Sequence, residues 1–214
     1  GYQSVFSNPT LLRPLMISVV TTVAGTFLGL FLSTVGAYVL IQWDMPGRNF
    51  FAGIMLFTMI FQGGMIPTYL VMKNLHLTNT LWVVILMPAI NVYNLVLMRN
   101  FFESVPESLY EAASIDGATR MKQLRCITIP SILPTIKVVV MLGVMGMLRN
   151  FDQIYVMSNA NILDRVRNLL YLIYTDGIVQ FRIGPASAAA CLVLAATYVI
   201  SAVVRKAIRY DEDA

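Results

Sequence analysis

Apolar residues along the chain gather into five long runs separated by polar intervals. A helix needs about 20 mainly apolar residues to cross roughly 30 Å of hydrocarbon. Four runs meet that length, namely residues 15–41, 50–72, 80–98 and 186–204, and a fifth, residues 132–148, is marginal. The pattern therefore predicts an all-α integral membrane protein, a polytopic helical bundle with five spans in this chain.

The first run carries small side chains at a regular spacing. Gly25, Gly29, Ser33 and Ala37 follow one another at steps of four residues, with Thr21 one step earlier. Small residues on one face let helix backbones approach closely in lipid. We therefore expect this face, and the alanine-rich residues 186–190, to pack tightly, although glycine and alanine are also simply common in membrane helices.

A long polar interval between the third and fourth runs holds dense helix signals. Ser104 and Glu107 have the spacing of a capping box, with Pro106 in the first turn, so we expect a helix to start here. Glu103, Glu107 and Glu111 would share one face of it, and Gly117 would end it, because glycine readily adopts positive φ.

A second short helix is expected at residues 119–126, before two prolines, Pro130 and Pro134, redirect the chain. Two short helices around a glycine turn have two interpretations. Their small apolar face is suited to a groove on another protein, whereas their charges are also typical of a solvated connector.

Composition agrees with a membrane protein. Of 214 residues, 57% are hydrophobic and 12% are charged, and the mean hydropathy is +0.71, against about 25% charged residues in soluble domains. The positive-inside rule modestly favours a topology in which residues 103–130 lie in the cytoplasm. The basic residues then inside are Arg48, Arg99, Arg120, Lys122, Arg125, Lys137, Arg205, Lys206 and Arg209, and those outside are Arg13, Lys73, Arg149, Arg165, Arg167 and Arg182.

Chemistry in the chain is sparse. No P-loop sequence is present, so this chain is not an ATPase, and no catalytic constellation can be assembled, so we expect no enzyme and no cofactor. Metal-ligand spacing is lacking, His76 is expected at the surface, and Cys126 and Cys191 are expected to be free thiols. The five runs hold no Asp, Glu or His, which disfavours an ion-coupled transporter.

Residues of the polar interval carry a resemblance to a known family. Glu111, Ala112 and Ala113, then Gly117 four residues after Ala113, and Ile127 and Pro130 further on match the EAA motif, with Ile129 where leucine is usual. The chain thus resembles the permease subunits of binding-protein-dependent ABC importers of type I. Asp116 before the glycine extends the motif to EAAxIDGA, which is similar to the branch that takes up sugars and oligosaccharides.

The resemblance implies a multi-pass subunit of the bacterial cytoplasmic membrane, a single permease domain over residues 1–214. Residues 103–130 would be a cytoplasmic coupling loop that docks on an ATPase through Glu111, Ala112, Ala113, Asp116, Gly117, Ile127 and Pro130. The implied partners are a second, similar permease, two ATPase subunits that hold ATP and Mg²⁺, an extracytoplasmic solute-binding protein, a carbohydrate and membrane lipid, with no nucleic acid. Because the family has six spans, one N-terminal span is expected to precede this chain.

Uncharged polar residues at membrane depth are candidates for a substrate path, because planar amides and aromatic faces bind sugars and unpaired amides are costly in lipid. They are Gln62, Asn91, Tyr93, Asn94 and, outside the fourth run, Asn150, Asp152 and Gln153. The alternative for the first four is helix-to-helix hydrogen bonding within the subunit, and the last three could gate the external mouth or cap the helix. A permease for peptides or amino acids and, less well, an ion-coupled transporter remain alternative functions.

Overall fold

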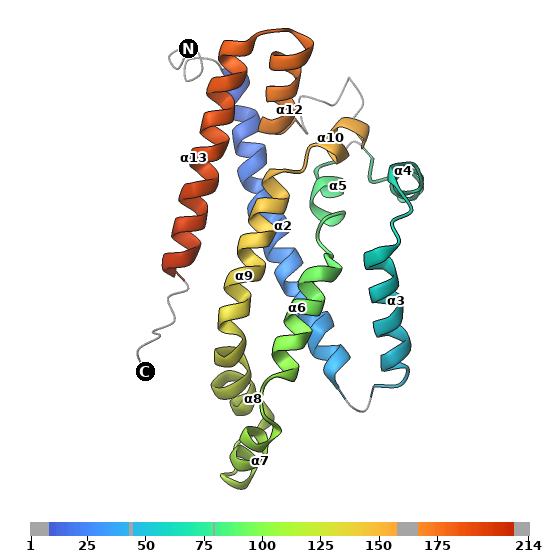
Figure 1. Ribbon diagram of the computed structural model, residues 1–214, viewed down its shortest axis with the longest axis vertical. Coiled ribbons are helices and arrows are strands. Elements are labelled where there is room, and N and C mark those ends of the chain that lie inside the picture. The colour runs from blue at the N-terminus through green and yellow to red at the C-terminus, as the bar shows by residue number, and fades with distance from the viewer. Residues whose placement is uncertain (1–8, 43–44, 79, 158–166, 208–214) are drawn as a thin grey trace.

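The computed structural model describes residues 9–42, 45–78, 80–157 and 167–207, so Arg165 and Arg209 of the charge count and residues 1–8 lie outside it. Every regular element within the described ranges is a helix (Figure 1), which confirms the all-α prediction. The elements are α2 (Pro9–Ile41), α3 (Arg48–Ile60), α4 (Met65–Asn74), α5 (Leu81–Leu86), α6 (Val92–Glu103), α7 (Glu107–Ile115), α8 (Arg120–Gln123), η1 (Leu124–Thr128), α9 (Ile129–Leu148), α10 (Asp152–Met157), α12 (Leu169–Tyr174), η2 (Thr175–Val179) and α13 (Ile183–Ala207).

Five continuous spans are not confirmed. Over the described residues, 3 helices are long and apolar enough to cross a membrane, Arg13–Ile41, Arg120–Val156 and Ile183–Val203. These correspond to the first, fourth and fifth apolar runs. The second and third runs are each divided into two shorter helices, for reasons that lie in single residues.

The second run is interrupted between α3 and α4. Gly64 takes φ 86° and ψ −179°, a backbone conformation that glycine adopts without steric cost. The helix therefore stops at Ile60 and starts again at Met65. One continuous helix over residues 50–72 is therefore not confirmed, because hydropathy does not register this break.

The third run is interrupted between α5 and α6, in a linker of residues 87–91 that contains Pro88. Proline has no N–H to donate to a helix. Asn91 is extended, and its side-chain Oδ1 accepts from the backbone N–H groups of Tyr93 at 3.0 Å and Asn94 at 3.3 Å. Asn91 thus caps the start of α6. Residues 80–98 therefore do not form one continuous helix, and the predicted third span is not confirmed as such.

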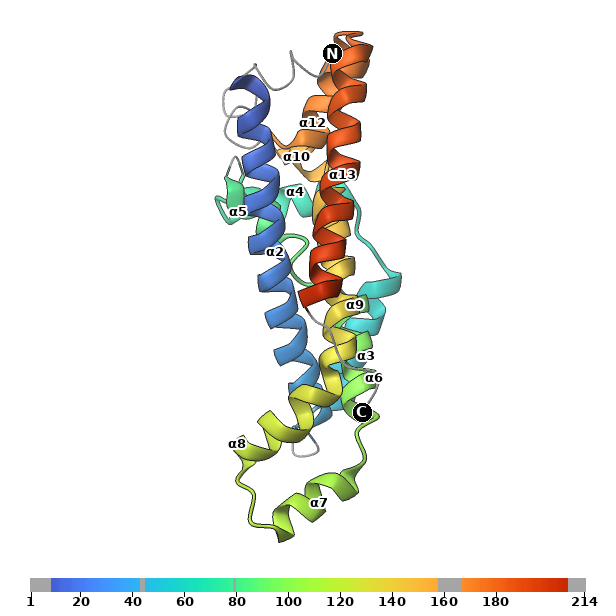
Figure 2. The ribbon, with the colours of Figure 1, turned by 90° about the vertical axis from the view of Figure 1, so that its left-hand side faces the viewer.

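Pro130 and Pro134 do not end the helix, although its direction changes between α8 and α9 (Figure 2). The helix runs without interruption from Arg120 to Leu148, through the π-helical turn η1. In that turn the N–H of Ile129 bonds to the carbonyl of Leu124, five residues back. The wider turn lies directly before Pro130 and accommodates its ring, which would collide with a carbonyl of an ordinary α-helix.

The bundle is built around α2, which packs along α6 and α9. Their shared core consists of Ala37, Leu40, Leu95, Met98, Phe102, Ile132 and Val139. At the end of the molecule opposite α7, a second core joins α5, α10 and α12 through Val83, Val84, Ile154 and Tyr171, and a third joins α12 to α13 through Leu169, Leu172 and Ala189. Figures 1 and 2 show α7 and α8 at one end and α10 and α12 at the other.

The strip of small residues on α2 faces the inside of this bundle. Ser33 and Ala37 are 1% and 0% exposed. A Cβ atom on Gly29 would lie 2.9 Å from the backbone carbonyl oxygen of Ala89 in the linker of residues 87–91. The small side chains therefore let α2 approach the broken third run and α9.

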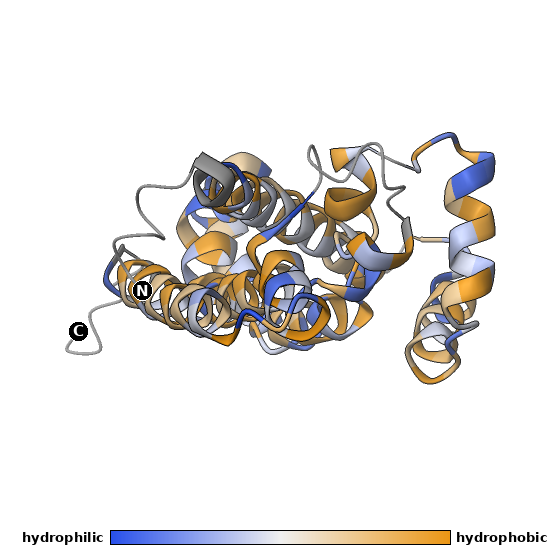
Figure 3. Ribbon diagram, turned by 90° about the horizontal axis from the view of Figure 1, so that it is seen from above, coloured by the Kyte–Doolittle hydropathy of each residue, from blue (hydrophilic) through white to orange (hydrophobic). Residues whose placement is uncertain are grey.

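Large apolar side chains cover the outside of the bundle. Phe27 on α2, Ile60 on α3 and Leu194 on α13 are 73%, 87% and 73% exposed. Seen from above, the helices are apolar over most of their length (Figure 3). Such an exterior is suited to lipid or to another subunit, because either removes this surface from water.

Candidate functional site

Helices α7 and α8 form a hairpin, residues 107–123, that we call the EAA hairpin. It projects beyond the end of the bundle (Figure 2). No residue of α7 or α8 is buried. The hairpin therefore offers most of its surface to a partner.

Gly117 ends α7, as predicted. It has φ 71°, and the N–H of Ala118 bonds back to the carbonyl of Ala113 at 2.9 Å, which closes the last turn as a Schellman motif. A Cβ atom at Gly117 would meet nothing within 4 Å. The backbone angle, not crowding, is what requires glycine here.

Side-chain hydrogen bonds hold the two arms of the hairpin together. Gln123 Nε2 on α8 donates to Ser114 Oγ on α7 at 2.9 Å and to the carbonyl of Ala118 at 3.3 Å. Thr119 caps α8 by accepting from the N–H of Lys122 at 3.4 Å. These contacts favour motion of the hairpin as one unit.

One further hydrogen bond joins the hairpin to the bundle. The hydroxyl of Tyr110 on α7 lies 3.0 Å from Oγ1 of Thr128, which is 4% exposed in η1. Thr128 leads directly into α9. The bond and the unbroken helix from Arg120 to Leu148 are two links between α7 and the membrane helices.

The predicted capping box does not form. Ser104 lies at the end of α6, where its hydroxyl donates to the carbonyl of Phe101 at 2.8 Å. α7 begins three residues later, at Glu107, after an extended Pro106. Glu103 therefore belongs to α6 and does not share a helix with Glu107 and Glu111.

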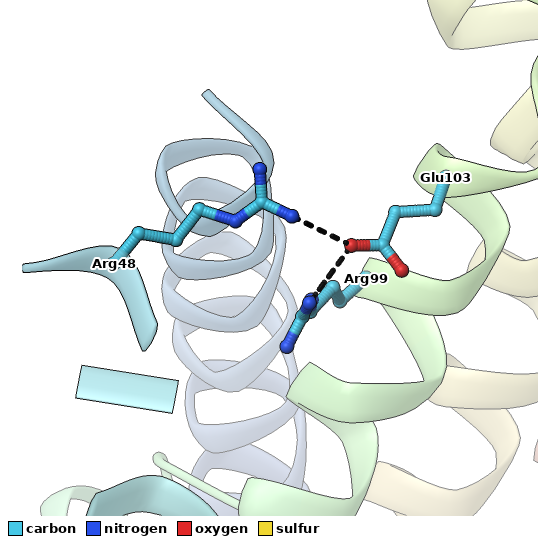
Figure 4. Close-up of polar contacts among 3 residues, drawn as sticks. All are labelled: Arg48, Arg99 and Glu103. Atoms are coloured by element: carbon cyan, nitrogen blue, oxygen red, sulfur yellow. Dashed lines mark hydrogen bonds and ion pairs between the residues drawn. The ribbon is translucent and has the colours of Figure 1, made fainter. Parts of the chain in front are cut away.

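Glu103 instead joins two helices through a pair of arginines (Figure 4). Its Oε1 atom lies 2.9 Å from Nη2 of Arg99, one turn back on α6, and 3.5 Å from Nη2 of Arg48, the first residue of α3. The carboxylate thus fixes the start of α3 to the residue at which the chain leaves for the EAA hairpin. Sequence analysis missed this contact, although the spacing of Arg99 and Glu103 is that of a helical ion pair.

The structure divides the seven predicted coupling residues into two groups. Glu111, Ala112, Asp116 and Gly117 are exposed on the EAA hairpin, and Ala113 is half-buried there. Ile127 and Pro130 lie beyond it, in η1 and in the first turn of α9. The first group faces outward and the second belongs to the helix that returns to the bundle.

A cavity of about 220 Å³ lies between α2, α9, the linker of residues 87–91 and residues 149–153. Five predicted substrate-path residues line it, Asn91, Asn94, Asn150, Asp152 and Gln153. Two do not: Gln62 is exposed in the break between α3 and α4, and the ring of Tyr93 is 53% exposed on the outside of α6. Residues far apart in sequence thus converge on one polar space.

The cavity offers hydrogen-bonding groups that the protein itself leaves unused. Among the described side chains, Thr26 Oγ1 and Gln153 Oε1 line it and are buried without a hydrogen-bond partner. Such groups are costly unless water or a ligand satisfies them. Thr26 was missed in the sequence because it follows Gly25 of the strip in a wholly apolar context.

Hydrogen bonds fix the rim of the cavity. Asn150 Nδ2 donates to the carbonyl of Val84 at 3.5 Å, and the Asn150 carbonyl accepts from Nδ2 of Asn168 at 2.7 Å. Asn168 also caps α12 by accepting from the N–H of Tyr171 at 2.8 Å. No cluster of metal-ligating side chains occurs in the described ranges. The cavity is lined by amides, a hydroxyl, the carboxylate of Asp152 and the guanidinium of Arg149.

Comparison with known proteins places the chain in a family. Residues 45–209 match the family described as the binding-protein-dependent transport system inner membrane component. Protein LplC of Bacillus subtilis (strain 168) is 40% identical over 151 residues, 71% of this chain and 51% of LplC. The polygalacturonan/rhamnogalacturonan transport system permease protein YtcP of the same strain is 43% identical over 136 residues, 64% of this chain and 48% of YtcP.

The fold matches solved transporters as well. A chain of a bacterial ABC transporter involved in the import of the acidic polysaccharide alginate is 27% identical, with a TM-score of 0.80, over 96% of this chain and 78% of that one. The chain spans about half the length of LplC and YtcP. From the matched residues and the shared fold, the chain belongs to the family of inner membrane components of binding-protein-dependent transport systems.

Proposed function

We propose that this chain is the transmembrane permease subunit of an ATP-driven importer that moves a sugar or oligosaccharide across the cytoplasmic membrane by alternating access. The observation that carries the proposal is the EAA hairpin, a pair of short helices joined by hydrogen bonds that projects from an apolar bundle. Neither helix of the hairpin has a buried residue. Membership of the family supports it, as does the relative named as a polygalacturonan/rhamnogalacturonan transport system permease protein.

The hairpin would dock in a groove on a cytoplasmic ATPase subunit, which holds ATP and Mg²⁺. Glu111, Ala112, Ala113, Asp116 and Gly117 would make the contact, and Ile127 and Pro130 would support the return to the bundle. Closure of the ATP-bound pair of ATPase subunits would then move the continuous helix from Arg120 to Leu148. Its far part, at Gly143 and Met147, is a wall of the cavity, so ATP state and cavity shape would be linked.

A second, similar permease would complete the path. The cavity of about 220 Å³ is smaller than the roughly 300–1,000 Å³ of a small-molecule site, so this chain supplies only part of one. The break between α3 and α4 also exposes backbone at residues 61–64, and such breaks in membrane proteins are covered by protein or line a wet space. An external solute-binding protein would deliver the carbohydrate to this pair.

Amides and hydroxyls in the cavity suit a carbohydrate better than an apolar solute, because each sugar hydroxyl both donates and accepts. Asn94, Gln153 and Thr26 would make these bonds once water is displaced. The relative named for polygalacturonan and rhamnogalacturonan makes uronic acid oligosaccharides the first substrates to test.

The test is co-purification followed by transport. The tagged chain should bring down a P-loop ATPase and a second permease, and the reconstituted complex with its solute-binding protein should accumulate trigalacturonate or arabinotriose only when ATP is supplied. Uptake driven by an ion gradient without the ATPase would contradict the proposal. Uptake of peptides or amino acids in place of both sugars would overturn the substrate class alone.

A further inference from the structure

Helices α10 and α12 lie at the end of the bundle opposite the EAA hairpin (Figure 1), and four aromatic rings of residues 151–174 contact one another there. The ring of Phe151 stacks with that of Tyr155 at 5.6 Å and lies 5.0 Å from that of Tyr174. Tyr155 meets Tyr174 edge to face at 5.5 Å, and Tyr171 lies 6.2 Å from Phe151. We call these four side chains the aromatic cluster.

The cluster has a buried floor and an open rim. Tyr171 is 8% exposed and belongs to the core that joins α5, α10 and α12, whereas Tyr155 is 52% exposed. Packing therefore explains Tyr171, but it does not explain why a large ring is held half in the open at residue 155.

The cluster continues into the cavity. Phe151 lines the cavity and also a second, apolar hollow of about 470 Å³ between α12 and α13, which Tyr174 lines as well. The N–H of Tyr155 bonds to the carbonyl of Phe151 at 3.0 Å, so the two residues are one helical turn apart. Tyr155 thus lies on the same side of α10 as Phe151 and Asp152, both of which line the cavity.

The chemistry of the rim matches a sugar ring. A pyranose has apolar C–H faces and a polar edge of hydroxyls, and tyrosine combines an apolar ring face with a hydroxyl that seeks a polar partner. The pKa of Tyr174 is raised, first by its hydrogen bond with the side chain of Tyr155 and next by the nearby charge that Tyr155 can carry. The hydroxyls of Tyr155 and Tyr174 thus lie together beside the ring faces.

We propose that Tyr155 and Tyr174, supported by Phe151 and Tyr171, form an outer carbohydrate subsite at the mouth of the cavity, where a sugar ring stacks before it enters. This inference rests on the proposed function and adds a site outside the cavity itself. Arg167, whose Cζ lies 5.8 Å from the centre of the Tyr171 ring, places a positive charge beside the subsite. An acidic sugar ring would gain from that charge.

An interfacial aromatic belt is the competing explanation, because tyrosine is enriched where membranes meet water. Tyr198 on α13 provides the matched control, because it is 70% exposed and contacts no ring of the cluster. A belt role predicts that replacing Tyr155 lowers stability in the membrane and that neither tyrosine responds to sugar. A subsite predicts that only Tyr155 responds to sugar.

The first experiment uses Tyr155→Trp, which keeps a stacking face and adds a fluorophore, in the complete transporter in lipid nanodiscs. The emission of the unmodified complex is subtracted. We expect a saturable change on titration with trigalacturonate or arabinotriose, and no change for Tyr198→Trp. Absence of a saturable change with both trisaccharides, or an equal change at Tyr198→Trp, would overturn the subsite.

The second experiment measures ATP-dependent uptake by Tyr155→Ala and Tyr155→Phe. Loss of one stacking contact should lower uptake at limiting sugar by about 3- to 10-fold for Tyr155→Ala, and Tyr155→Phe should stay within about twofold of the parent. Normal uptake by Tyr155→Ala would sink the subsite and leave the proposed function standing. A fluorescence response to sugar without any ATP-dependent uptake would contradict the proposed function and leave the sugar subsite standing.

Discussion

Two glycines in this chain are required for different physical reasons. Gly29 allows close approach, because a Cβ there would lie 2.9 Å from the carbonyl oxygen of Ala89. Gly117 has open space around it but a φ of 71°, so its role is conformational. The difference decides which substitutions each position should tolerate.

We expect Gly29→Ala to destabilise the protein and to distort the cavity. The added methyl group would press on backbone, which cannot move aside as a flexible side chain can, and overpacking of this kind costs about 1–3 kcal/mol. Thermal unfolding in detergent should show a lower midpoint. Gly53→Ala is the control, since a Cβ there meets nothing within 4 Å, and an equal loss at both positions would contradict the argument.

At Gly117 the contrast is between two side chains. Asparagine tolerates the left-handed region, whereas a β-branched residue does not. Gly117→Val should therefore disturb the hairpin turn and release or uncouple the ATPase, with membrane insertion unchanged, while Gly117→Asn should keep most activity. The measurement is ATPase co-purification together with uptake, and full uptake by Gly117→Val would count against docking through this turn.

A second substitution probes the half-buried face of α7. Ala113→Asp would place a charge where the proposed ATPase groove closes over the helix, and an unpaired buried charge is costly. We expect weaker binding of the ATPase and an intact fold. Ala112→Asp, at a more exposed position of the same helix, tests which side of α7 faces the groove.

At the scale of elements, the sequence predicts helices well and their interruptions poorly. Hydropathy finds all the apolar runs, and the EAA hairpin follows from its motif and from Gly117. The breaks at Gly64 and at Asn91 depend on a backbone angle and on a cap, which hydropathy does not measure. Pro130 shows the opposite failure, because the π-helical turn before it preserves a helix that a proline is expected to end.

The candidate sites follow the same division. The EAA motif residues could be named because their motif is local, and their coupling role stays a prediction. Five residues of the cavity could be named because polar side chains stand out in an apolar chain. Thr26 and the ion pair between Arg48 and Glu103 were missed, because each depends on which helices meet in space. Tyr93 and Gln62 look like Asn94 in the sequence, yet only Asn94 lines the cavity.

The link between hairpin and bundle is testable at this scale. Tyr110→Phe removes the hydrogen bond to Thr128, which should cost about 0.5–1.5 kcal/mol locally. Hydrogen exchange should become faster in α7, and uptake per ATP hydrolysed should fall. Tyr93→Phe serves as the control, because it removes a hydroxyl from an exposed ring on α6. Unchanged exchange of α7 in Tyr110→Phe would show that the bond to Thr128 does not hold the hairpin.

For the whole molecule, the proposed mechanism requires the EAA hairpin to lie in the cytoplasm. The EAA hairpin lies at one end of the bundle and α10 and α12 lie at the other (Figure 1), and the basic residues Arg120, Lys122 and Arg125 follow the hairpin turn. A positive excess near short cytoplasmic segments sets orientation. The bias in this chain is modest, so orientation needs a direct measurement.

Two native cysteines make that measurement possible without redesign. Cys126 is exposed just beyond the hairpin, and Cys191 is exposed within the apolar span Ile183–Val203. A membrane-impermeant maleimide should label Cys126 in inverted membrane vesicles and not in intact spheroplasts, because the reagent reaches only the outer face of each. Cys126→Ser should abolish the signal, and Cys191→Ser should leave it unchanged, since a membrane-impermeant reagent does not enter the lipid around an apolar span. Labelling of Cys126 in intact spheroplasts would place the hairpin outside the cell, where no ATPase could reach it.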